Sequence, residues 1–247
     1  MCREEAKAVA ARNMALVLAA GMLSLACGGR LTTTAGVAAE APPPVTQPAE
    51  EDLQPRPCPE RVFEGDYGVT DEASLAALED YTRVTGTLRI GGPDLENIEW
   101  LGCLREVGGD LEIGGDALTN VDGLSGLISV AGSVDIHGTF ELANVDGLTA
   151  LTDIGGHLSI ARNDALQSLD GLSDLTSVGS DLYVSSNPAL PSLDGLRGLA
   201  SIDGHLSIRN NAALPTCEAE ALRDRFAAAG WTGTFSIVGN DDRGVCQ

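Results

Sequence analysis

Lysine is almost absent from this sequence. Lys7 is the only lysine in 247 residues, and 15 lysine and arginine residues stand against 36 aspartate and glutamate residues, giving a formal net charge of −21. Binding to nucleic acid or to anionic lipid through charge requires clustered cations. The composition excludes a basic surface of that kind, and we expect no nucleic-acid partner.

Signatures of catalysis are missing as well. The sequence has no G-x-S-x-G nucleophile motif and no phosphate-binding P-loop. It has three histidines and no C-x-x-C pair, so the spacing of a zinc site is absent. We therefore expect no enzyme activity, no cofactor and no resident metal.

The one long apolar run lies near the N-terminus. Residues 14–26 (MALVLAAGMLSLA) are fewer than the ~20 residues that a membrane-spanning helix needs, so residues 1–26 are interpreted as a signal peptide for export. The stretch LSLAC (23–27) resembles the lipobox of bacterial lipoproteins, although Ser24 stands where that family has leucine. The resemblance implies that Cys27 is lipidated and begins the mature chain. An ordinary signal peptide, cleaved nearby, is the alternative.

The segment after the lipobox has a different composition. Residues 27–57 are rich in proline and alanine and contain few large apolar side chains, so we expect a disordered tether. Gly28 and Gly29 stand where an aspartate would resemble a signal for retention in the inner membrane. The expected location is therefore the outer membrane, held by the lipid, with the protein facing the periplasm or the cell surface.

Six cysteines are consistent with export. Cys2 leaves with the signal peptide and Cys27 takes the lipid, so four remain, and an even number in an oxidising compartment suggests two disulfides. Four cysteines allow three pairings. We favour Cys58–Cys103 with Cys217–Cys246, because each of these pairs brackets one end of a repeat region.

The repeat region begins at Val84. Its segments open with VTGTLRI, VGGDLEI, VAGSVDI, IGGHLSI, VGSDLYV and IDGHLSI, and they recur after 23 residues twice and after 24 residues from then on. A fixed period of this length indicates a solenoid, in which each repeat buries its apolar side chains against its neighbours.

A single repeat can be interpreted residue by residue. Leu158 and Ile160 alternate with polar residues, so they point inward from a short strand. Further leucines return to the core, and Asp170-Gly171 forms a corner between them. Glycine is frequent and no segment keeps a clean helical period, which disfavours helical leucine-rich repeats. The sequence predicts an all-β fold, a right-handed parallel β-helix of about six 23–24-residue coils.

Caps are expected at both ends of the repeats. Residues 71–81 and 217–230 have the apolar spacing of short helices. Helices there would protect the sheet edges of the first and last coils. We place an N-terminal cap at 58–83 and a C-terminal cap at 217–247, within one domain that spans 58–247.

This arrangement resembles a known family. A cysteine, a short helix and V-x-G-x-L-x-I repeats with N-x-x-L segments are similar to the receptor L-domain, the leucine-rich β-helix of insulin and epidermal growth factor receptors. They are also similar to modules of bacterial surface lipoproteins and fungal wall proteins. The resemblance covers about 58–247 and departs from the family at a recurring Asp-Gly-Leu motif. It implies protein binding or a structural role without enzyme activity, and it assigns no ligand residues.

The Asp-Gly-Leu motif places an acid at the same position of four repeats, Asp122, Asp146, Asp170 and Asp194. Stacked carboxylates about 5 Å apart repel each other unless they are hydrogen-bonded or neutralised. We favour a structural turn, in which the aspartate accepts backbone N–H groups and the glycine supplies an unusual φ. A ladder of calcium ions is the alternative, but the known calcium repeat has a period of nine residues.

A column of amides follows the inward-pointing strand residues, at Asn163, Asn187 and Asn211. Stacked amides can bond to the loop of the next coil. We predict a structural ladder, with contact to a glycan or another ligand as the alternative.

The outward strand positions supply the candidate ligand face, His157, Asp181, Tyr183 and His205. The two histidines are two coils apart, ~9–10 Å, with Asp181 between them. A His-Asp-His metal site requires these side chains to converge, whereas a solvated face with local charge pairing needs no convergence. We favour the solvated face, and Tyr183 is the single aromatic of its column.

These observations predict a non-catalytic module for binding, adhesion or recognition in a bacterial envelope, with an unidentified protein or glycan ligand. A purely structural envelope protein is the first alternative. An enzyme that degrades polysaccharide is the second, and it is disfavoured because the acids follow the turn pattern and do not form an isolated pair.

Lipidation of Cys27 can be tested by metabolic labelling with a fatty acid. We expect the intact chain to be labelled and Cys27→Ser to abolish the label, because the thiol is the point of attachment. Cys2→Ser is the matched control and should remain labelled. Equal labelling of the Cys27→Ser variant would contradict the lipoprotein interpretation.

Overall fold

A computed structural model describes residues 58–246. The predicted signal peptide (1–26), the lipidation site Cys27 and the tether (27–57) lie outside the described residues. Within 58–246, no helix has the length and apolar character needed to cross a membrane.

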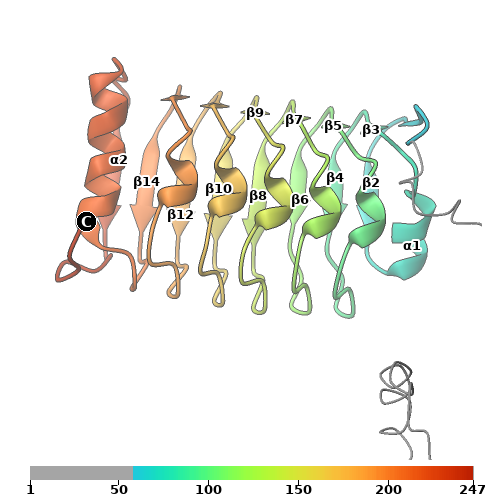
Figure 1. Ribbon diagram of the computed structural model, residues 1–247, viewed down its shortest axis with the longest axis horizontal. Coiled ribbons are helices and arrows are strands. Elements are labelled where there is room, and N and C mark those ends of the chain that lie inside the picture. The colour runs from blue at the N-terminus through green and yellow to red at the C-terminus, as the bar shows by residue number, and fades with distance from the viewer. Residues whose placement is uncertain (1–57, 247) are drawn as a thin grey trace, which may run out of the picture. The chain divides into compact units, whose positions relative to one another are not determined.

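Two parallel sheets make up most of the described chain, in a solenoid-like arrangement with few helices. The longer sheet has eight strands, in spatial order β2 (Tyr67–Val69), β4 (Leu88–Ile90), β6 (Leu111–Ile113), β8 (Val134–His137), β10 (Leu158–Ala161), β12 (Leu182–Ser185), β14 (Leu206–Arg209) and β15 (Phe235–Val238). The shorter-stranded sheet has seven, β1 (Val62–Phe63), β3 (Arg83–Val84), β5 (Glu106–Val107), β7 (Ser129–Val130), β9 (Asp153–Ile154), β11 (Ser177–Val178) and β13 (Ser201–Ile202). Successive repeats lie side by side in one row (Figure 1).

The register of the longer sheet confirms the sequence period. Leu88 pairs with Leu111, which pairs with Val134, and these steps span 23 residues. The next steps, from Val134 to Leu158 and onward, span 24 residues. Each repeat thus adds one strand to each sheet.

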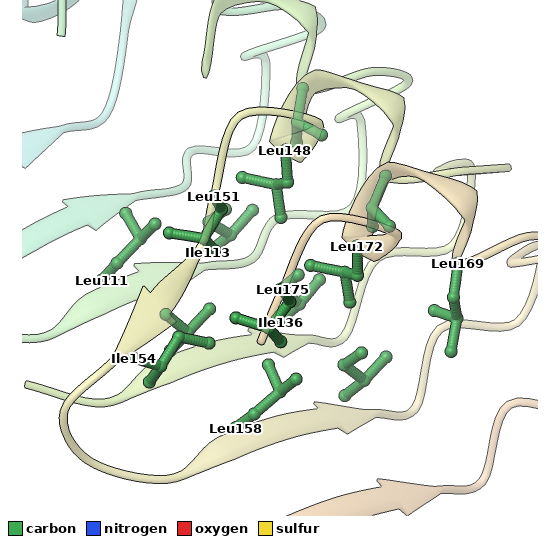
Figure 2. Close-up of a cluster of buried hydrophobic side chains, with 14 of the residues drawn as sticks. Leu111, Ile113, Ile136, Leu148, Leu151, Ile154, Leu158, Leu169, Leu172 and Leu175 are labelled. Atoms are coloured by element: carbon green, nitrogen blue, oxygen red, sulfur yellow. The ribbon is translucent and has the colours of Figure 1, made fainter. Parts of the chain in front are cut away.

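The core consists of aliphatic side chains from every repeat. Leu158 and Ile160 of β10 are fully buried, and Leu169, Leu172 and Leu175 from the remainder of the repeat meet them. Figure 2 shows Leu158, Leu169, Leu172 and Leu175 pointing into one cluster with side chains of the neighbouring repeats, and Ile160 belongs to the same cluster. Burying a leucine or isoleucine contributes about 1.5–3 kcal/mol, and much of that burial here comes from the adjacent repeat.

Each corner is a single turn of 3-10 helix between the two sheets. The turns are η1 (Glu99–Leu101), η2 (Asp122–Leu124), η3 (Asp146–Leu148), η4 (Asp170–Leu172) and η5 (Asp194–Leu196). They stack on one another from repeat to repeat. The corner predicted at Asp170-Gly171 therefore lies where the sequence placed it.

The two predicted helices are present at the ends. Helix α1 (Glu72–Ala77) begins at Asp71, whose side chain accepts the Ser74 N–H, and it is shorter than predicted because the chain turns at Asp80, where φ is 67°. Helix α2 (Thr216–Ala228) stands at the C-terminal end of the stack (Figure 1) and buries Leu222 and Phe226 against the core.

Both favoured disulfides are present. Cys58 is joined to Cys103, with Cα atoms 5.4 Å apart, and Cys217 to Cys246, with Cα atoms 6.1 Å apart. The first ties the start of the described chain to the residues after η1, and the second ties the start of α2 to the C-terminal segment. Each bond fixes one end of the stack.

The predicted asparagine column is a hydrogen-bonded ladder. Asn187 is fully buried, its Nδ2 donates to the Ile160 carbonyl (2.9 Å), and its Oδ1 accepts the backbone N–H of Asn163 (3.1 Å). Asn163 and Asn211 make the same contacts with their own neighbours. The ladder is longer than the sequence suggested: Thr139 begins it and Asn240 ends it. The amides therefore satisfy buried backbone groups between repeats.

The ladder also holds an uncommon backbone conformation. The residue before each buried asparagine lies in the left-handed region, with φ of 58° at Arg162, 56° at Ser186 and 57° at Asn210. A side chain in this region costs about 1–2 kcal/mol. The bonds of the following asparagine offset that cost and fix the loop.

Removing one ladder amide should weaken the whole stack. We expect Asn187→Ala to lower the free energy of unfolding by at least about 2 kcal/mol, because the Ile160 carbonyl and the Asn163 N–H lose their partner inside the protein. Chemical denaturation followed by circular dichroism measures this change.

The matched control is Asn144→Ala, which removes a partly exposed amide whose Oδ1 accepts only the Asp146 N–H. This control should lower the free energy of unfolding by about 0.5–1.5 kcal/mol. Similar losses for the two variants would contradict a special role for the ladder.

Candidate functional site

The four residues of the candidate ligand face lie on the outer side of the longer sheet. Tyr183 points outward from β12, and His157, Asp181 and His205 immediately precede β10, β12 and β14. The Tyr183 ring centroid lies 6.1 Å from that of His157 and 6.4 Å from that of His205. The structure therefore brings these residues into one cluster, which we call the ring cluster.

Asp181 is the centre of the ring cluster. Its carboxylate accepts the Tyr183 hydroxyl (2.6 Å) and the backbone N–H of His205. These bonds, led by the one from His205, hold the pKa of Asp181 below its usual value. The hydrogen bond between Tyr183 and Asp181 raises the pKa of Tyr183, because ionising the hydroxyl would remove the proton that it donates to the carboxylate. Asp181 is therefore a fixed anion at neutral pH.

The two histidines do not converge on Asp181. The His157 ring contacts Asp135 (3.2 Å) and the Ser133 hydroxyl (2.9 Å), while the His205 ring contacts the Thr234 hydroxyl (2.7 Å). Within 58–246, no three histidine, cysteine or acidic side chains are placed to hold a metal ion. The geometry is that of local pairing on a polar face.

The sequence did not predict which side chains form hydrogen bonds with the two histidines. Ser133 and Asp135 belong to the repeat before His157, and Thr234 follows α2, far from His205 in the chain. The stacking of repeats creates these contacts. The strand period predicts which outward residues of successive repeats lie in one column. The rotamer of each imidazole decides which neighbouring side chain it contacts.

The mechanism predicted for the Asp-Gly-Leu corner is wrong for the aspartate and for the glycine. The aspartates are exposed, and at Asp170 the backbone N–H donates to the Ser168 hydroxyl (2.9 Å), so the acceptor is the side chain two positions earlier and not the aspartate. Asp122 is arranged in the same way with Asn120 (3.2 Å). Among the four corner carboxylates, the described contacts pair one, that of Asp194, with Arg197 at 2.7 Å.

The corner glycines have a different function from the one predicted. Gly171 and its equivalents do not have a positive φ. A Cβ atom on Gly171 would instead collide with the carbonyl of Val145 in the preceding repeat, and one on Gly147 would collide with the carbonyl of Val121. Glycine is required here because successive backbones approach too closely for any side chain.

The comparisons with known proteins give no assignment: no family model, curated protein or solved structure matches this chain. A functional proposal therefore depends on the geometry of this polar face and on the sequence features of the N-terminal segment.

The close approach at the corner predicts a large difference between two glycine substitutions. We expect Gly171→Ala to lower the free energy of unfolding by about 1–3 kcal/mol, because the added methyl group forces neighbouring backbones apart. Thermal or chemical unfolding of the purified variant measures the loss.

Gly102→Ala is the matched control, because Gly102 also lies at a corner, has φ of −59°, and has its nearest potential neighbour, the Glu99 carbonyl, at 3.8 Å. Its stability should be unchanged or slightly raised. An unchanged stability of Gly171→Ala would refute the packing explanation.

Proposed function

We propose that this chain is a non-catalytic binding module of a bacterial cell envelope. In this proposal residues 58–247 form a receptor L-domain-like, right-handed parallel β-helix of about six coils. The lipidated Cys27 and the tether 27–57 anchor the module to the outer membrane. The module presents its polar face to a protein or glycan on the surface or in the periplasm.

The observation that carries this proposal is the ordered state of the ring cluster. Asp181 holds Tyr183 and the backbone of His205, and the neighbouring repeats hold both imidazoles. A surface whose side chains are already fixed loses little conformational entropy when a ligand binds. Such a face suits recognition.

Export is supported by the cysteine chemistry. Two disulfides at the ends of a small aliphatic stack are typical of proteins from oxidising compartments. An envelope location places the face where proteins and glycans are available as ligands.

The electrostatics of the cluster favour binding over hydrolysis of polysaccharide. A glycosidase needs one carboxyl group whose pKa is raised, so that it can donate a proton to the leaving group. The pKa of Asp181 is lowered by its hydrogen bonds. Asp181 therefore suits a fixed acceptor for a ligand donor.

The proposal is tested by a variant in which His157, Tyr183 and His205 are all alanine. The fragment 58–247 is incubated with isolated bacterial cell envelopes, and the fraction that sediments with them is measured. We expect the variant to lose at least about tenfold in affinity, since aromatic contacts dominate many interfaces.

The control variant has alanine in place of three outward residues of the other sheet, Arg83, Ser129 and Ser201. It should bind as the unmodified fragment does. Equal binding by the ring-cluster variant would exclude this face as the site, and no binding by the unmodified fragment would exclude the proposed function.

A further inference from the structure

A second polar site lies at the other end of the longer sheet, apart from the ring cluster. It is an open hollow of ≈ 430 Å³ at the ends of β4, β6 and β8. These three strands are adjacent in the N-terminal half of the stack (Figure 1). Its polar side chains are those of Arg89, Glu112, Asp116 and His137.

The asparagine ladder does not reach the two repeats that supply most of the hollow. The ladder begins at Thr139, and the corresponding loop positions of the two preceding repeats are Pro93 and Asp116. Neither has a side-chain amide to donate to the next coil. Within these loops the backbone contacts are long, 3.4 Å at Leu95 and 3.5 Å at Leu118, and the two loops are joined through Thr119, whose N–H (3.0 Å) and hydroxyl (2.9 Å) both donate to the Glu96 carbonyl.

The floor of the hollow is backbone. Gly91 and Gly114 follow β4 and β6, and in later repeats this position carries a side chain such as Ser185 or Arg209. A Cβ atom on Gly91 would lie 2.9 Å from the Gly114 carbonyl oxygen, so a side chain here would force the neighbouring backbone to shift. The result is a surface of Cα–H and peptide groups beneath the polar rim.

The rim carries hydrogen-bonding capacity that the described protein does not use. Arg89 donates through Nε to Glu112 (3.0 Å), and this is its one side-chain hydrogen bond within 58–246. The exposed His137 ring lies over Gly114, and a Cβ there would be 3.5 Å from its Cε1 atom. Among the three histidines, His137 alone makes no ring hydrogen bond in this range, in contrast to His157 and His205.

We propose that this hollow binds a neutral saccharide unit. Its guanidinium, carboxylates and imidazole supply both donors and acceptors, which the several hydroxyls of a pyranose require. The glycine floor accommodates the C–H face of the ring.

Other ligand classes fit the hollow less well. Arg89 is already paired with Glu112, and Asp116 adds a negative charge, which disfavours anions. The described residues offer no metal-binding group of three side chains. The apolar side chains of the lining are those of Pro93, which is exposed, and Ile90, which is 2% exposed, so a large apolar ligand would have little to contact.

The site is tested with the full chain, labelled with ¹⁵N-glycine and kept in a detergent without a sugar headgroup. The probes are methyl β-D-glucopyranoside, methyl α-D-mannopyranoside and N,N′-diacetylchitobiose. We expect at least one probe to shift the amide signals of Gly91, Gly92, Gly114 and Gly115 saturably, with a dissociation constant of about 1 mM or tighter. Absence of a saturable shift with all three probes would overturn the proposal.

Two variants test the assignment of the rim. Arg89→Ala and His137→Ala should each weaken binding by about fivefold or more, as expected when hydrogen bonds to a ligand are removed. Both side chains are exposed, so the variants should fold. Arg209→Ala, which removes an exposed arginine at the end of β14, is the charge-matched control and should bind as the unmodified chain does.

Two further comparisons separate this site from the ring cluster and from other ligands. The variant with alanine at His157, Tyr183 and His205 should keep the glycine shifts, because the hollow does not include those residues. Loss of the shifts in that variant would refute an independent site. Equal shifts with acetate or spermidine would refute the saccharide assignment.

Discussion

The whole structure depends on how closely successive repeats must approach one another. Parallel strands pair at about 4.8 Å, and each repeat has to meet this spacing at both sheets and at the corner. At the corner, Gly171 lies so near the Val145 carbonyl that no side chain fits between the two backbones. In the loop, Asn187 bridges the same distance with an amide that replaces missing backbone partners. The sequence repeats because every coil must satisfy this distance at the same places.

That constraint decides where function can reside. The inward positions are occupied by leucine, isoleucine and valine, and the corner and ladder positions by residues that join the backbones. Only the outward columns are free to vary in chemistry. Neighbours in a column belong to different repeats, so contacts such as His157 with Asp135 link residues that are 22 positions apart. A polar face on such a stack is therefore fixed by the stacking itself.

The sequence was sufficient for the parts of the structure that repeat. The period predicted the strand register, the inward leucines and the column of asparagines, and the placement of the cysteines at the ends predicted both disulfides. It could not predict the ends of the ladder. Thr139 departs from the asparagine pattern, and Asn240 follows Asn211 by 29 residues because α2 intervenes. It also could not give the reason for the glycine in each corner, since close packing and a special φ demand the same residue.

The hollow lay beyond the sequence for a related reason. Its floor glycines look like ordinary turn residues in the sequence. Pro93 and Asp116 occupy the positions of the later asparagines and lack their amides, but the sequence does not show that the residues around them line one hollow. The two halves of the outer face then differ physically. Around Tyr183 the polar groups are bonded to one another, whereas around His137 the imidazole makes no hydrogen bond within 58–246 and Arg89 uses one of its donors, with Glu112. A ligand at the first half meets a fixed surface that is already satisfied, but at the second half it completes hydrogen bonds that the stack leaves open. A ligand with many hydroxyls can form hydrogen bonds with donors that the protein itself does not use. In our proposal, the half of the face around His137 is therefore where a polyol binds.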